Sequence, residues 1–189
     1  MSLIEYDQPE RFVVGTIGPP GQRVFFVQAR SARRTTSVGL EKTQVAVLAD
    51  RLNDMLDEYA GGTATEQAAH EFADTGPLDT PVEEEFRVGT MGLSWDEATR
   101  QVVLEMHAVG DAFDIADVDE LASSGELAED PASDPTQFVL RVRLPAAMAR
   151  AFAQRSRMVV SAGRPNCPFC AGPIDPSGHI CPRSNGYRR

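Results

Sequence analysis

The sequence predicts an α+β protein with two tandem β-β-β-α units, antiparallel sheet structure, helices packed on one face, and a small C-terminal ribbon. Three observations support this prediction. Residues 11–18 (RFVVGTIG) and 85–92 (EFRVGTMG) are similar, and each opens a half in which two more β-rich runs and a helix-like segment follow. The three cysteines are confined to residues 167–181, near the end of the chain. Because the order of segments agrees as well as the motif, we interpret the two halves as an internal duplication.

Alternating side chains indicate the strands. In the run 138–144 (FVLRVRL), Leu140, Val142 and Leu144 fall on one face, whereas the two arginines fall on the other. Short connections between such runs favour hairpins and therefore antiparallel pairing. Besides 138–144 and the two openings, the β-rich runs are 23–29, 35–40 and 101–109.

Apolar residues at helical spacing predict two helices. In residues 41–60, Val45, Leu48 and Leu52 recur every three or four positions and form one apolar face. The Gly61-Gly62 pair that follows is a stop signal. The second helix, 145–162, begins at a proline, which suits a first helical turn because its missing N–H would have no partner there.

These elements divide the chain into a duplicated α+β domain at 1–162 and a tail at 163–189. Within the domain we expect repeat 1 at 10–60, an acidic linker at 61–82, and repeat 2 at 83–162 with an acidic insertion at 111–135. The aspartates of the insertion do not have the spacing of a calcium-binding loop. We therefore interpret both acidic segments as solvated surface loops.

The net charge of −10 is unevenly distributed. Residues 54–85 contain ten acidic residues and no Lys or Arg, whereas residues 141–189 contain nine Arg and one acid, Asp175. The acidic loops and a basic helix face could simply offset one another. Alternatively, the arginines could form a basic surface for an anionic partner.

The cysteines and one histidine have the spacing of a metal site. Cys167 and Cys170 form a C-x2-C pair, and His179 and Cys181 form an H-x-C pair eight residues later. Residues two apart on an extended strand point the same way, so the second pair can present two ligands together. A Cys3His set predicts tetrahedral Zn²⁺ in a structural role, because four protein ligands close the coordination sphere. Thiolates also suit iron, so a mononuclear iron centre remains open.

The tail has little else to hold a shape, and its end is basic. Its large apolar residues are Phe169, Ile174, Ile180 and Tyr187, so we expect the metal to supply folding energy to this small core. Candidate contacts for an anion or a nucleic acid are Arg183, Tyr187, Arg188 and Arg189, together with Arg141 and Arg143. These arginines could equally neutralise the acidic segments.

The sequence gives little sign of catalysis or membrane insertion. It has no P-loop, nucleophile elbow or dinucleotide-binding glycine motif. His107 and Glu105 would share a strand face, either as an acid–base pair or as ordinary sheet neighbours, and His70 belongs to an acidic loop. There is no apolar run long enough to span a membrane and no basic, apolar leader, so we expect a cytoplasmic protein.

Three functions fit this pattern. A non-enzymatic adaptor or regulatory module with a protein partner fits a closed zinc site without a catalytic motif. A single-strand nucleic-acid binder is the alternative, since the layout is similar to that of Whirly and PUR-type proteins and Phe25 and Phe26 could stack on bases. An enzyme that acts on a phosphorylated small molecule is a further alternative.

The Val-Gly-Thr openings, the duplicated layout and the tail CPFCAGPIDPSGHICPRSNGYRR resemble one known family. It is an actinobacterial family of unknown function, DUF3090, whose members are described as repeat proteins. The resemblance covers essentially the whole chain, and the tail is its most specific part. It implies the same fold and the same cysteine and histidine positions, but no activity that can be transferred.

Overall fold

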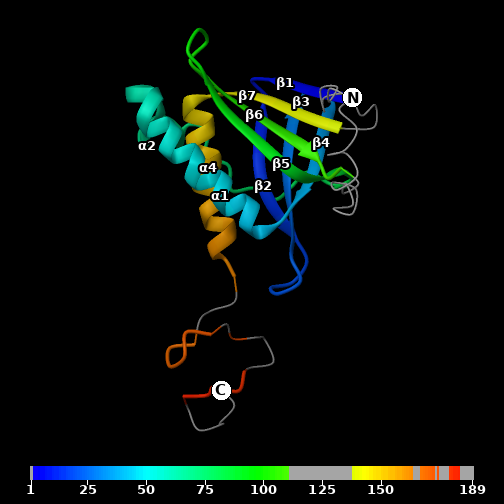
Figure 1. The fold of residues 1–189 in the computed structure, drawn as a ribbon, viewed down its shortest axis with the longest axis vertical. Helices are drawn as coiled ribbons and strands as arrows, with labels where there is room; N and C mark the ends of the chain where they lie inside the picture. The colour runs from blue at the N-terminus through cyan, green and yellow to red at the C-terminus, as the bar shows by residue number, and fades with distance from the viewer. Residues whose placement is uncertain (1, 111–137, 164–166, 173, 175–178, 184–189) are drawn as a thin grey trace, which may run out of the picture.

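The computed structural model describes residues 2–110, 138–163, 167–172, 174 and 179–183. The acidic insertion predicted at 111–135 therefore lies outside the described residues. The described chain folds as an α+β domain, and the cysteine-rich tail follows its last helix (Figure 1). No helix in these residues has the length and apolar character needed to cross a membrane.

A single seven-stranded sheet forms the body, in the order β1-β7-β6-β5-β4-β3-β2. Strands β2, β3 and β4 pair antiparallel, as do β5, β6 and β7. The pairs β4–β5 and β1–β7 are parallel, so the sheet is mixed. The strands are β1 (Ser2–Asp7), β2 (Arg11–Ile17), β3 (Val24–Ser31), β4 (Arg34–Leu40), β5 (Glu84–Asp96), β6 (Gln101–Ala108) and β7 (Phe138–Pro145).

The parallel pairs differ from the antiparallel sheet that the sequence predicted, for a topological reason. After β4 the chain crosses over through a helix before it enters β5, and a crossover of that length returns the next strand in the same direction. Strand β1 was not predicted. It pairs with β7, and Tyr6, the residue before its last, is buried and shares a hydrogen bond of 2.9 Å with Thr36 Oγ1.

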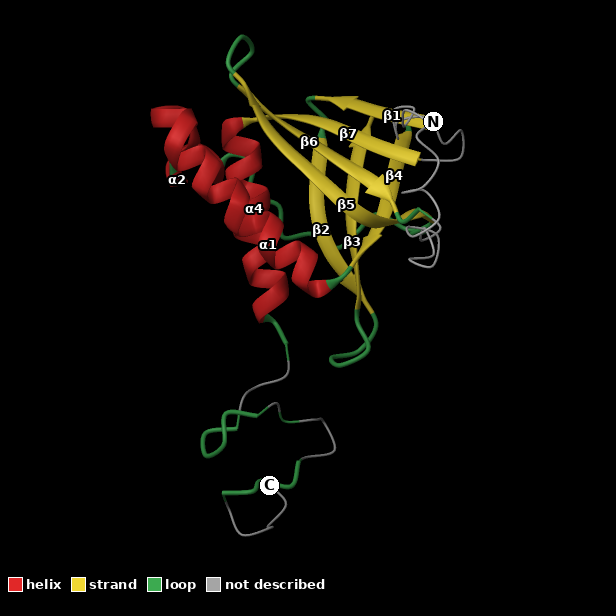
Figure 2. Ribbon diagram, in the orientation of Figure 1, coloured by secondary structure: helices red, strands yellow, loops and turns green. Residues whose placement is uncertain are grey.

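Helices cover one face of the sheet (Figure 2). They are α1 (Lys42–Met55), α2 (Glu66–His70) and α4 (Ala146–Ser161). The predicted apolar face of α1 is confirmed, since Val45, Leu48 and Leu52 are at most 3% exposed. Helix α1 continues into a π-helical turn, Leu56–Ala60, and a 3-10 turn, Gly61–Ala64. His70, expected in a loop, ends α2.

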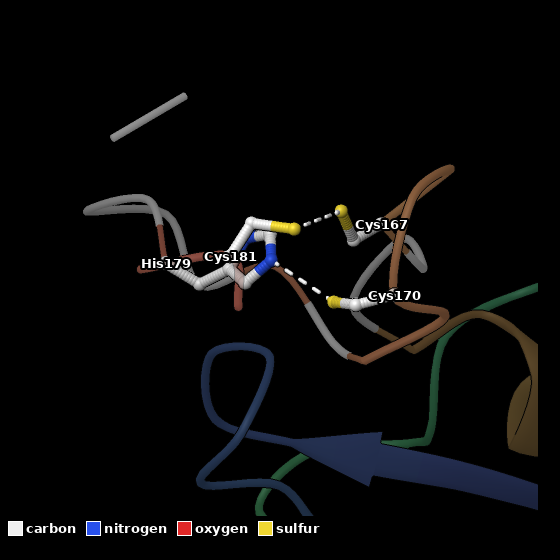
Figure 3. Close-up of side chains that lie close together, drawn as sticks. All are labelled: Cys167, Cys170, His179 and Cys181. Carbon is white, nitrogen blue, oxygen red and sulfur yellow. Dashed lines mark hydrogen bonds between the residues drawn. The ribbon is translucent and has the colours of Figure 1, made fainter. Parts of the chain in front are cut away.

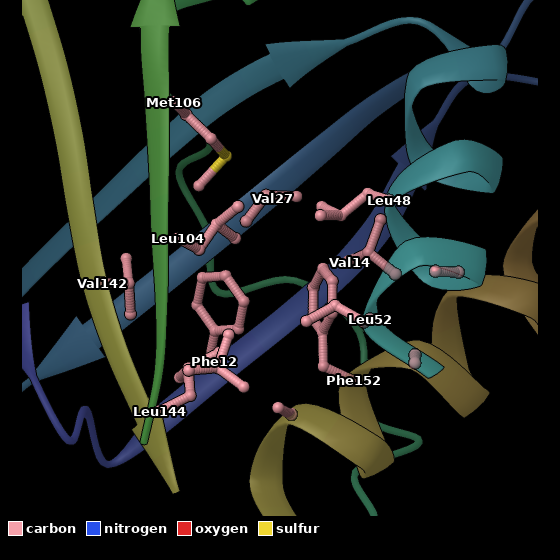
Figure 4. Packing of buried hydrophobic residues seen from close by; sticks show 14 of the residues in the cluster. Phe12, Val14, Val27, Leu48, Leu52, Leu104, Met106, Val142, Leu144 and Phe152 are labelled. Carbon is pink, nitrogen blue, oxygen red and sulfur yellow. The ribbon is translucent and has the colours of Figure 1, made fainter. Parts of the chain in front are cut away.

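The main core lies between the sheet and helices α1 and α4 (Figure 4). At its centre the rings of Phe12, from β2, and Phe152, from α4, lie 4.5 Å apart between centroids. Leu104 and Val142 enter from β6 and β7 and are completely buried. The alternation predicted for 138–144 is confirmed, because Leu140, Val142 and Leu144 are buried and Arg141 and Arg143 are only half-buried on the other face.

The order of elements is the same in both halves, β2-β3-β4-α1 and β5-β6-β7-α4. The Val-Gly-Thr triplets at 14–16 and 88–90 lie in β2 and β5, the opening strands of the two halves. An internal duplication remains a prediction, as do the domain boundaries.

The acidic linker is not the solvated loop that composition suggested. Leu78 is buried against Val13 and Phe26 on the sheet face opposite the main core. A Cβ added to Gly15 would lie 2.6 Å from Leu78 Cγ, so the linker passes closer to β2 than any side chain at that position allows. The linker therefore covers part of the second face of the sheet.

Two arginines fix the linker, and we call this group the arginine clamp: Arg11, Arg155 and their partners Asp74 and Gly76. Arg155, on α4, is 8% exposed and donates to the carbonyl oxygens of Val14 (2.6 Å) and Gly76 (2.7 Å) and to the backbone and carboxylate oxygens of Asp74. Arg11 donates Nε to Asp74 Oδ2 at 2.7 Å. The Arg11 hydrogen bond is the main cause that lowers the pKa of Asp74 to about 2.

Candidate metal centre

The predicted metal ligands converge in the tail. The ligand atoms of Cys167, Cys170, His179 and Cys181 all lie within 4.8 Å of one another (Figure 3). Cys167 and Cys181 are buried, and Cys170 and His179 are half-buried. The C-x2-C and H-x-C pairs are separated in sequence by a glycine- and proline-rich stretch. The two pairs face each other across the site (Figure 3).

The spacing of the ligand atoms fits a tetrahedral ion. Cys167 Sγ and Cys181 Sγ are 3.7 Å apart, and Cys170 Sγ and His179 Nε2 are 3.4 Å apart. Metal bonds of about 2.3 Å to sulfur and about 2.0 Å to nitrogen, at tetrahedral angles, require separations of about 3.8 Å and about 3.5 Å. The two observed values lie close to these separations, and all four ligand atoms lie within 4.8 Å of one another, so the cluster can hold one metal ion.

A local turn aims the first two sulfurs. The amide of Ala171 donates to Cys167 O at 2.8 Å, and the amide of Cys167 donates to Gly172 O at 2.7 Å. Ala171 adopts the left-handed conformation, with φ of 59°, which closes the turn. The residues between and after the two cysteines are therefore bent back toward the sulfurs.

Backbone amides also act on the thiols. Burial disfavours the Cys167 thiolate, but N–H groups of Cys170 and Phe169 point at its sulfur, and the net effect lowers the pKa of Cys167. The amide of Gly172 favours the Cys170 thiolate, but loss of water and the neighbouring thiols outweigh it and raise the pKa of Cys170. Three thiols this close compete for negative charge, which a divalent cation would relieve.

His179 presents one ring nitrogen to the sulfurs. Its Nε2 is the atom close to Cys170, and its Nδ1 is buried with no hydrogen-bond partner among the described residues. Metal-bound histidines usually donate the second ring N–H to a neighbouring group, which fixes the tautomer. Nε2 is therefore the ring nitrogen that faces the cluster.

The prediction that the large apolar residues of the tail form a small core is wrong for two of them, which are exposed. Phe169 is 42% exposed and Ile180 is 68% exposed. Phe169 lies in the turn between the first two cysteines, and Ile180 lies between His179 and Cys181. Among the described residues of the tail, these two large apolar side chains therefore do not form a buried core.

The other predicted contact residues are not gathered at one place. Arg183, in the tail, is exposed and its Nη1 donates to Phe169 O at 3.2 Å. Arg141 Nε donates to Glu105 Oε1 at 2.6 Å, and Arg141 and Arg143 both lie within 3.4 Å of Glu5 Oε1. Tyr187, Arg188 and Arg189 lie outside the described residues.

The proposed stacking residues are almost completely buried. Phe25 belongs to the main core, and Phe26 lies beneath Leu78 of the linker; they are 6% and 7% exposed. The expectation that these rings stack on bases is therefore wrong. His107 does lie beside Glu105, as predicted, with Nε2 3.7 Å from Oε2, but the same carboxylate also binds Arg141.

The arginine clamp and a basic pocket at the end of α4 were missed by sequence reasoning. Asp74 and Arg155 are 81 positions apart, and only the fold brings them together. The pocket combines Arg23 and Lys42 with residues of α4 and its C-terminal end. No local spacing pattern connects these positions, so no signal in the sequence alone could have identified them.

Comparison with known proteins gives one match. A family model described as "Protein of unknown function (DUF3090)" matches residues 4–181, a range that ends at Cys181, the last of the four clustered residues. No curated protein matches the chain, and no solved structure matches it. Because the matched range covers nearly the whole sequence, the chain belongs to the DUF3090 family.

Proposed function

We propose that the tail binds one structural zinc ion through Cys167, Cys170, His179 and Cys181, and that the chain is a non-enzymatic adaptor. The observation that supports the zinc site is the convergence of the four ligand atoms, two of whose separations are close to tetrahedral values. Four protein ligands fill a tetrahedral sphere and leave no position for a water or a substrate. The ion would therefore stabilise the tail rather than act in catalysis.

The donor set selects among metals. Thiolate and imidazole ligands favour zinc or iron over magnesium and calcium, which prefer oxygen. Elemental analysis of the full-length protein should return about one zinc per chain. Cobalt exchanged into the site should show the intense visible absorption of a tetrahedral cobalt thiolate. An iron–thiolate spectrum in protein from native cells, with iron in place of zinc, would refute the zinc assignment.

A histidine pair supplies a matched control for the site. His179→Ala removes one ligand and should lower the affinity for zinc by tenfold or more, because loss of even an outer-shell partner costs about 10–100-fold. The control, His107→Ala, changes a residue of β6 and should keep the wild-type zinc affinity. Equal zinc affinity of the two variants in competition with a chelator would refute His179 as a ligand.

The adaptor role is supported by the side chains that the two ligand pairs expose. Ile180 and Phe169 are exposed, one within each pair, and the Arg183 guanidinium donates to the Phe169 carbonyl. A zinc ion would hold these side chains in fixed positions, which lowers the entropic cost of binding a partner. Charge complementarity indicates a protein segment with an apolar side chain flanked by carboxylates.

A surface variant tests this role without removing a ligand. Ile180→Asp should keep the zinc but lose the partner, because it adds a buried charge at the centre of the contact. Affinity purification of wild type and variant from native cells, followed by direct binding with the purified partner, measures the effect. A partner that binds both proteins equally, or no partner for the wild type, would overturn the adaptor role.

A further inference from the structure

We propose that a pocket at the junction of the domain and the tail binds a small organic anion, a carboxylate or phosphate carried on a short apolar body. The pocket has a volume of about 240 Å³ and lies between the β2–β3 turn, the start of α1 and the end of α4. It is lined by Gly21, Arg23, Phe25, Lys42, Val160 and Gly163. Nothing in the zinc site or in the adaptor role uses it.

The lining divides into an apolar part and a cationic part. Phe25 and Val160 supply the apolar walls, and Phe25 is otherwise buried in the main core. Arg23 and Lys42 supply two positive charges, and none of the described residues that line the pocket is acidic. A ligand that matches this surface carries an anionic group at one end and an apolar group at the other.

Both cations retain hydrogen-bonding capacity. Arg23 Nη2 donates to Ala162 O at the end of α4, which leaves most of its five N–H donors for a ligand. Lys42 Nζ forms no hydrogen bond or ion pair within the described part of the chain, although it lies only 3.8 Å from a Cβ built on Gly163. Arg23 is therefore positioned by the protein, whereas Lys42 is available to close on an oxyanion.

The balance of local charge favours an anion. The C-terminal end of α4 contributes about half a negative charge, which the two cations exceed. Glu41 precedes Lys42 in sequence, but its carboxylate lies 3.4 Å from Arg87 Nη1 and is compensated there. In a chain with a net charge of −10, a pocket with excess positive charge is a local exception.

The volume limits the size of the ligand. Sites for drug-sized molecules occupy about 300–1,000 Å³, so this pocket suits a smaller molecule. Benzoate and phenyl phosphate are suitable probes, because each joins an oxyanion to one ring. Inorganic phosphate has the anionic group without the ring, and benzyl alcohol has the ring without the anionic group. Both should bind more weakly than phenyl phosphate.

The test is a titration of the full-length, zinc-loaded protein with these probes, in which backbone amide chemical shifts report binding. Phenyl phosphate or benzoate should shift the amides of Phe25, Val160 and Gly163. Lys42→Met should weaken binding about tenfold, since a charge-assisted hydrogen bond contributes at least the free energy of one decade in affinity. Arg51→Met, on the same helix but outside the pocket lining, should bind as the wild type does.

Lys42 makes no hydrogen bond or ion pair in the described chain, so its replacement is not expected to disturb the fold. Equal affinity in the Lys42→Met and Arg51→Met variants would overturn the proposal. Shifts confined to other residues, or no shifts up to the solubility of the probes, would also overturn it. If inorganic phosphate binds as tightly as phenyl phosphate, the apolar walls do not contribute and the proposed ligand class is wrong.

Discussion

Replacing Arg155 with methionine should release the acidic linker from the sheet and destabilise the domain by about 3 kcal/mol. The side chain is 8% exposed and donates to backbone carbonyl oxygens of Val14, Asp74 and Gly76. A hydrogen bond from a charged donor contributes about 1.5–3 kcal/mol where it is buried, as at Val14 O, and less at the half-buried oxygens of Asp74 and Gly76. Asp74 keeps its pair with Arg11, so the larger penalty for an unpaired buried charge is not incurred.

Arg157 provides the matched control on the same helix. Its ion pair with Asp50 joins side chains that are 58% and 65% exposed, so Arg157→Met should cost at most about 1 kcal/mol. Urea unfolding followed by the fluorescence of Trp95, the single tryptophan, measures both variants. With a slope of about 2 kcal/mol per molar urea, Arg155→Met should lower the midpoint by about 1.5 M.

A second readout separates linker release from general loss of stability. Hydrogen exchange in residues 74–79 should accelerate more than exchange in the sheet when Arg155 is replaced, because those residues lose their direct contact. If Arg155→Met lowers the midpoint no more than Arg157→Met does, the arginine clamp does not stabilise the domain. Uniform acceleration across the sheet would show that the linker is not held separately.

Three further outcomes follow from the same region. Leu78→Ala should cost about 2–4 kcal/mol in urea unfolding, because it opens a cavity over Val13 on the second face of the sheet. Gly15→Val should be destabilised by more than 1 kcal/mol, because a Cβ at residue 15 would lie 2.6 Å from Leu78 Cγ. Combining it with Leu78→Ala should restore part of that loss. If Gly15→Val were as stable as wild type, the close approach of the two residues would be contradicted. The folded-state pKa of Asp74 is about 2, against an ordinary 3.8, so the contribution of its carboxylate to the free energy of unfolding is complete above about pH 4 and is lost as the pH falls through 2. The pKa shift corresponds to about 1–2 kcal/mol after allowance for partial exposure. The difference in free energy of unfolding between wild type and Asp74→Asn should therefore narrow by that amount between pH 5 and pH 2.

Patterns that are local in sequence predicted local structure. The spacing of Val45, Leu48 and Leu52 defines the buried face of α1, and the alternation in 138–144 separates buried Leu140 from half-buried Arg141. The clustering of the four cysteine and histidine residues was likewise predictable, since all lie within fifteen positions and form two closely spaced pairs. In each case the interacting groups are close along the chain.

Contacts between distant segments were not predictable in the same way. Strand β1 is identified by its pairing with β7, more than 130 positions away, and its own sequence mixes Leu3 and Ile4 with acids. The position of Leu78 over Val13 depends on the path of the linker across the sheet. Composition described residues 61–82 correctly as acidic but could not show that two aspartates in that segment have arginine partners.

These partners bear directly on the alternative of nucleic-acid binding. The sequence places nine arginines after residue 140, but charges act on a ligand only where no carboxylate lies against them. Arg141 is bound to Glu105 and Glu5, and Arg155 to Asp74, so these cations would have to exchange an existing ion pair for a phosphate. Such an exchange gains little, because the carboxylate left behind repels the incoming anion. At Arg23 and Lys42 the described lining residues include no carboxylate, so an anion that binds there would displace no existing ion pair.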